Sequence, residues 1–130
     1  MKEINLKKTV HGSTKEVVAK LTEALKAEGF GVLTRIDLDS KLKEELNKDI
    51  PSTIILGTCN PELAYEAFKT NAHVAGLLPC NAVVREIAPY ESSVELARPS
   101  LLMDIIEDEH LSHLGRYADT KLNRVLDSLH

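Results

Sequence analysis

The sequence predicts a single α+β domain with about five strands. Stretches in which apolar and polar residues alternate, which is typical of strands, are interspersed with stretches in which apolar residues recur at helical spacing. A length of 130 residues suits one domain with one core. Neither an internal repeat nor a Gly/Ser-rich linker divides the chain, so we expect residues 1–130 to fold as one unit.

Composition and charge argue against several classes of protein. Hydrophobic residues make up 43% and charged residues 28% of the chain, which is ordinary for a globular protein. The formal net charge is −4 and lysines alternate with acids, so a nucleic-acid partner is not expected. The first eight residues lack the apolar region of a secretory signal, and no later run reaches the ~20 apolar residues of a membrane span. We therefore expect a cytoplasmic protein without a membrane partner.

The first elements alternate between strand and helix. Residues 4–10 follow a period of two and predict a strand. Ser13 stands three residues before Glu16, which is the spacing of a capping box, and the apolar residues that follow have helical spacing. Gly29 can adopt the left-handed conformation that ends such a helix. A second strand is predicted at residues 30–38, because Phe30, Val32, Ile36 and Leu38 share one parity. A helix between two strands favours a crossover connection.

The middle of the chain predicts a connection, a buried strand and a helix. Residues 39–48 contain only two leucines, four apart, which fits either a short surface helix or a mobile connection. Residues 53–59 are apolar on both parities and predict a central strand buried on both faces. Asn60 and Pro61 are favourable helix-starting residues, so a helix should extend to about Asn71. Its expected core residues are Ala64, Ala67 and Phe68.

The second half of the chain predicts a hairpin followed by helix. Residues 78–88 and 93–97 form two candidate strands joined by a turn. From Ser100 onward only a helical period fits the apolar residues. The acidic residues 107–109 either begin a new helix or lie on the outer face of a continuing one. We therefore expect one kinked helix or two consecutive helices.

Two cysteines are the most informative candidate functional residues. Cys59 precedes Asn60 at the end of the buried strand, and Cys80 precedes Asn81 at the start of another. A position just before a helix N-terminus, such as that of Cys59, favours the thiolate form. If the two strand ends meet, the thiols could form a reversible disulfide or bind a soft metal, either zinc or copper. The alternative is that both cysteines pack as small hydrophobic residues.

A wider ligand site is predicted around these thiols. Glu86 shares strand parity with Cys80 and could face a cleft, although a cross-strand ion pair is the alternative. His110 and His113 are three residues apart, but an exposed helix surface explains them better than a metal site. No common catalytic motif occurs, so the sequence assigns no reaction. The predicted ligand-binding residues are Cys59, Asn60, Pro61, Pro79, Cys80, Asn81 and Glu86, with Cys59 and Cys80 as metal ligands.

Several of these motifs, taken in order, resemble the family of domains of unknown function DUF302. The resemblance spans nearly the whole chain and rests on the Gly29-Phe30 turn, Asp37, the junction from Gly57 to Pro61, and Leu78-Pro79. It implies a curved, mainly antiparallel sheet with helices on one face, similar to the TATA-binding-protein-like (TBP-like) fold, often in a dimer. It implies no DNA binding, because a fold does not determine a function. In such a fold the first helix packs across the sheet.

We therefore expect a small-ligand or interaction module that forms a homodimer. One alternative is a thiol-based redox or soft-metal protein that uses Cys59 and Cys80, and another is a structural or assembly domain. An uncovered edge strand at residues 93–97 or the apolar tail helix could form the dimer interface.

Overall fold

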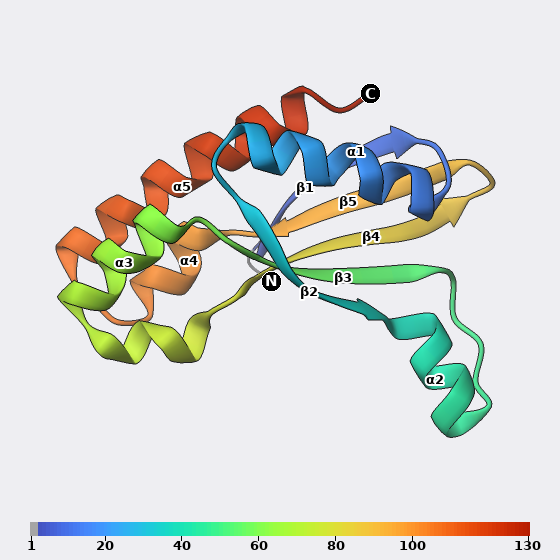
Figure 1. The fold of residues 1–130 in the computed structure, drawn as a ribbon, viewed down its shortest axis with the longest axis horizontal. Coiled ribbons are helices and arrows are strands. Elements are labelled where there is room, and N and C mark those ends of the chain that lie inside the picture. The colour runs from blue at the N-terminus through green and yellow to red at the C-terminus, as the bar shows by residue number, and fades with distance from the viewer. Residues whose placement is uncertain (1–2) are drawn as a thin grey trace.

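The structure is a computed structural model that describes residues 3–130, and it consists of one sheet and several helices (Figure 1). In chain order the elements are β1 (Asn5–His11), α1 (Thr14–Ala27), β2 (Gly31–Asp37), α2 (Leu38–Leu46), β3 (Thr53–Cys59), α3 (Pro61–Thr70), the 3-10 helix η1 (Ala72–Leu77), β4 (Cys80–Ala88), β5 (Glu91–Ala97), α4 (Pro99–Asp104) and α5 (Glu109–Asp127).

The five strands form one antiparallel sheet in the order β1-β5-β4-β3-β2. The predicted α+β class and the antiparallel sheet are therefore confirmed. The sheet is open, with β1 and β2 as its edges. The predicted hairpin is also confirmed, because β4 and β5 are neighbours joined by a tight turn.

Strand order corrects two expectations. Residues 93–97 are not an edge strand, because β5 pairs with β1 on one side and β4 on the other. The buried strand β3 is an interior strand, but β4 occupies the middle of the sheet. Helix α1 connects β1 at one edge to β2 at the other and so packs across the sheet. The apolar residues on both parities indicate that β3 is interior, but they carry no information on strand order. The strand is also not fully buried on both faces, because Ile55 is only partly buried.

Helices α1 and α5 cover one face of the sheet (Figure 1). Most of the strand residues that point toward these helices are buried, as are most apolar residues on the facing stripes of both helices. A smaller cluster lies beyond the ends of the strands, where α3, η1, α4 and α5 meet. The main core includes Val10, Leu21, Leu25, Leu56, Val84, Val94, Leu96, Leu122 and Val125, and the smaller cluster contains Ala67, Val74, Met103 and Leu111.

The predicted helix ends are confirmed. The Ser13 side chain accepts a hydrogen bond from the Glu16 amide at 3.1 Å, and the Glu16 carboxylate accepts one from the Ser13 amide at 3.3 Å, which completes the capping box. At the other end of α1, Gly29 has a φ of 86°. The Phe30 amide donates to the Leu25 carbonyl and the Gly29 amide to the Lys26 carbonyl, which is the Schellman arrangement.

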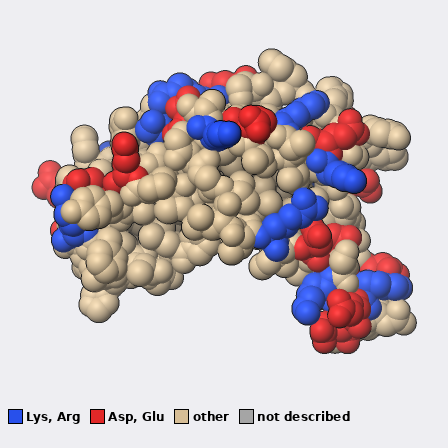
Figure 2. Space-filling model, in the orientation of Figure 1, with Lys and Arg blue, Asp and Glu red and all other residues tan. Residues whose placement is uncertain are grey.

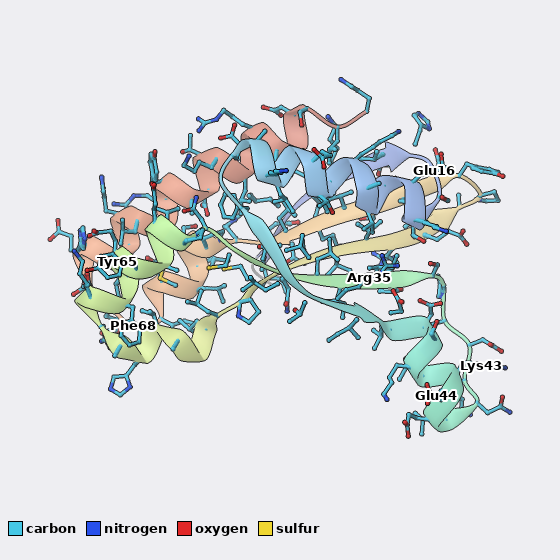
Figure 3. All side chains as sticks on the ribbon, in the orientation of Figure 1. Glu16, Arg35, Lys43, Glu44, Tyr65 and Phe68 are labelled. Atoms are coloured by element: carbon cyan, nitrogen blue, oxygen red, sulfur yellow. The ribbon has the colours of Figure 1, made fainter. Side chains whose placement is uncertain are left out.

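The remaining helices resolve the alternatives left by the sequence. Residues 38–46 form the short surface helix α2, none of whose side chains is fully buried, and it projects from the body of the molecule (Figure 1). The tail forms two consecutive helices, with Asp108 as the N-cap of α5. Phe68 does not belong to the core. Phe68 is 53% exposed on α3, and Tyr65 on the same helix is 63% exposed (Figure 3).

The second face of the sheet carries no packed helix layer. Ile36, Ile55 and Val83 pair across β2, β3 and β4 on this open face. The parity predicted for 30–38 fails here, because a bulge between Val32 and Thr34 turns Ile36 away from the core. Figure 2 shows that the molecule is arched, with α2 projecting at one end, and that uncharged atoms dominate the hollow.

None of the helices within residues 3–130 combines the length and apolar character needed to cross a lipid bilayer.

Candidate functional site

A small cavity lies where the ends of β3 and β4 meet α3, α4 and α5. Its volume is about 60 Å³. Apart from two thiols, the lining is apolar except for Thr58 and Asn60. We call this cavity the sulfur pocket. Its half-buried rim consists of Cys59, Asn60, Leu63, Ala64, Leu78 and Cys80, and its buried lining includes Phe30, Ala67, Pro99, Met103, Gly115 and Ala118.

The junction between β3 and α3 positions Cys59 and Asn60. Strand β3 ends at Cys59, and Asn60 caps α3 because its Oδ1 accepts a hydrogen bond from the Leu63 amide at 3.2 Å. The Asn60 Nδ2 also donates to the Glu28 carbonyl at 3.5 Å, which links the end of α1 to the start of α3. A Cβ atom on Gly29 would lie 3.2 Å from that Nδ2, so the left-handed glycine also leaves room for the asparagine.

Strand pairing brings the second thiol to the same place. Thr58 is the cross-strand partner of Cys80, and its hydroxyl donates to the Cys80 carbonyl at 3.0 Å. Cys80 therefore lies diagonally across from Cys59, and both cysteines are free thiols. Burial raises the pKa of the Cys80 thiol, and the neighbouring Cys59 raises it further. At neutral pH Cys80 is thus a protonated thiol.

Helices α4 and α5 form the far wall of the pocket. They cross closely at Gly115, where a Cβ atom would lie 2.8 Å from the Ser100 Cα and 3.0 Å from the Pro99 carbonyl oxygen. The Ser100 amide donates to the Asp119 carboxylate at 3.1 Å, which connects the two helices. Met103, one helical turn after Pro99, contributes a thioether to the lining. Sequence reasoning missed Met103, because no local pattern in the sequence indicates that α4 packs beside the strand ends.

The structure gathers three of the seven predicted ligand-binding residues: Cys59, Asn60 and Cys80 line the sulfur pocket. The other four lie outside it. Pro61 is the exposed first residue of α3 and Asn81 is exposed on β4. The Pro79 ring covers Gly57, where a Cβ atom would lie 2.9 Å from the proline Cγ. Glu86 is exposed at the far end of β4, opposite Ser92.

No group of three or more His, Cys, Asp and Glu side chains in residues 3–130 is arranged to hold a metal ion. His110 and His113 are both exposed on α5. Any metal at the sulfur pocket would therefore depend on the two thiols and on ligands of another type.

Comparisons with known proteins agree with this fold. The family model described as domain of unknown function DUF302 matches residues 6–129. The crystal structure of an uncharacterized conserved DUF302 protein from Bacillus stearothermophilus is similar to this chain, with 27% sequence identity and a TM-score of 0.92. The similarity covers 99% of this chain and 100% of that one. A search of curated proteins finds no match.

Proposed function

The chain belongs to the DUF302 family, and from that premise we propose that it is a small-ligand-binding module that acts as a homodimer, with the sulfur pocket as its ligand site. The observation that supports the ligand site is the pocket itself: an apolar cavity whose rim carries two free thiols and one amide. Ligand sites typically combine apolar walls with a few polar groups that orient the ligand.

The size of the pocket restricts the ligand. A volume of about 60 Å³ is well below the roughly 150 Å³ of an engineered cavity that binds benzene. The pocket therefore suits a single ion, a group of a few atoms, or the apolar end of a larger molecule. An organic cofactor would not fit inside it.

Xenon tests whether the pocket accepts a ligand, because this atom enters apolar cavities. We expect methyl resonances of Leu63, Ala67 and Leu114 to shift in NMR spectra recorded under xenon pressure, since all three residues line the pocket. The variant Ala64→Leu should abolish these shifts by filling the rim.

The variant Tyr65→Leu is the matched control, because Tyr65 is on the same helix but exposed outside the pocket. It should leave the xenon shifts unchanged. Pocket methyl resonances that do not move in the wild-type protein would contradict the proposed site.

The open face of the sheet supports the homodimer. Ile36 is 49% exposed there beside Ile55 and Val83, and the same face carries Arg85 and Glu95. A twofold interface must be complementary to itself, and a face that bears apolar residues and both signs of charge meets this requirement.

A further inference from the structure

We propose that the sulfur pocket binds a single copper(I) ion through Cys59, Cys80 and Met103, an assignment that rests on the proposed ligand-binding function of this pocket. These residues come from three separate elements, the end of β3, the start of β4 and α4, and all three line the same cavity.

The chemistry of the lining favours copper(I) over zinc. Thiolate and thioether are soft ligands that select copper(I), whereas structural zinc is held by four Cys or His ligands. Neither a histidine nor a carboxylate lines the pocket. A thioether adds the third sulfur that the two cysteines alone do not provide.

The dimensions and polarity of the pocket suit an ion that coordinates few ligands. A volume of about 60 Å³ is sufficient for one metal ion. Met103 is 6% exposed, and the walls around it are apolar. An apolar shell controls solvent access to a metal and thereby its redox behaviour. Such walls limit the access of water to the ion from the buried side of the pocket.

The N-terminus of α3 stabilises the negative charge of the copper complex. Binding of Cu⁺ to two thiols forms two copper–sulfur bonds and releases two protons to solvent, which leaves a net charge of −1. Cys59 precedes the N-terminus of the ten-residue helix α3, whose positive end stabilises a nearby negative charge. Because binding releases the protons of the two thiols, the affinity for copper should increase with pH.

Competition with the coloured bicinchoninate complex of copper(I), under anaerobic conditions, tests the assignment on the full chain. We expect the wild-type protein to remove one equivalent of copper from the chelator. The variants Cys59→Ser and Cys80→Ser should lose this capture, and Met103→Leu, which preserves the packing volume, should weaken the affinity about tenfold. Zinc at the same free concentration should not be retained.

The double variant Cys59→Ala/Cys80→Ala provides the background, and its melting temperature and amide NMR spectrum establish that it is folded. Retention of copper by the wild type no stronger than by this variant would overturn the proposal. An affinity unchanged in Met103→Leu would overturn it as well. Because xenon reports on the cavity independently of the metal, xenon shifts without copper capture would remove the copper assignment and leave the ligand site standing.

Discussion

The Glu95 carboxylate accepts hydrogen bonds from three neighbouring residues. The donors are Asn5 at 2.9 Å, Arg85 at 3.0 Å and, at a longer distance of 3.4 Å, Ser93. Burial raises the pKa of this carboxyl, but the hydrogen bonds and the charge of Arg85 together outweigh burial, so the net pKa is below its ordinary value of 4.5. The ionised form therefore stabilises the junction of β1, β4 and β5.

A pH titration of stability checks this role. The folded pKa of Glu95 is below the unfolded value, so its contribution is fully present above the unfolded pKa and is lost as pH falls through the folded pKa. We expect Glu95→Gln to lower the free energy of unfolding by about 1 kcal/mol at neutral pH. In urea denaturation, the difference from wild type should shrink as pH falls below 4.5.

Glu44→Gln is the control, because Glu44 is exposed on α2 (Figure 3). Its effect should be small at every pH. A Glu95→Gln deficit that persists unchanged in acid would show that the loss comes from altered packing and not from the charge.

Sequence reasoning succeeded where the chemistry of a residue acts on its immediate neighbours. Ser13, Gly29 and Asn60 were identified as helix-terminal residues because capping needs only the adjacent backbone amides and carbonyls. Met103 was missed for the opposite reason. Its thioether gains significance only because α4 packs beside the strand ends, and no local pattern reports that packing.

At the level of elements, the crossing of α4 and α5 depends on Gly115. The backbone of α4 occupies the space that a side chain at this position would need. A second hydrogen bond connects α4 to α5, because the Ser112 hydroxyl donates to the Asp104 carboxylate at 2.6 Å. This crossing sets the position of Met103 and hence the far wall of the sulfur pocket.

Gly115→Ala should therefore destabilise the protein, although alanine is the better helix former by about 1 kcal/mol. The new Cβ would lie 2.8 Å from the Ser100 Cα and force the backbones apart. Overpacking of this kind costs about 1–3 kcal/mol, so after the gain in helix propensity we expect a net loss of up to about 2 kcal/mol in urea denaturation.

Gly76→Ala is the matched control, since a Cβ at that position meets nothing within 4 Å. It should change the free energy of unfolding by less than about 0.5 kcal/mol. Equal effects of the two substitutions would contradict the importance of the close crossing.

Elements were predicted well, whereas their arrangement was not. Residues 53–59 read as a buried strand because both parities are apolar, but the same pattern fits any interior position in a sheet. The mistaken edge at 93–97 has a similar cause, since pairing with the distant β1 leaves no local signal. The bulge near Leu33 likewise places Ile36 on the open face of the sheet, opposite to the face that its parity predicts. The approach of Cys59 and Cys80 to one pocket could be predicted only on the condition that the ends of their strands meet.

At the scale of the whole molecule, one face of the sheet is packed against helices and the other is open within an arch (Figures 1 and 2). The proposed homodimer uses this open face. We expect light scattering coupled to gel filtration to give twice the chain mass of 14.4 kDa. Ile36→Glu should reduce the mass to that of one chain, because it places an unpaired charge in the interface.

Tyr117→Glu introduces the same charge at an exposed position on α5, whose apolar stripe packs on the opposite face of the sheet. It should leave the dimer intact. A wild-type protein that elutes with the mass of a single chain at all concentrations would contradict the homodimer.

The pairing of β1 with β5 also shapes how the chain must be assembled during synthesis. Asn5 lies opposite Ala97 and Val10 opposite Ser92, so the strand made first finds its only neighbour in the strand made last. Ribosomes add about 5–20 residues per second, and β1 must wait several seconds before residues 91–97 exist. Such distant contacts slow folding and leave the early strand exposed to other chains. Until β5 has been synthesised, β1 is therefore an unpaired strand that other chains could contact.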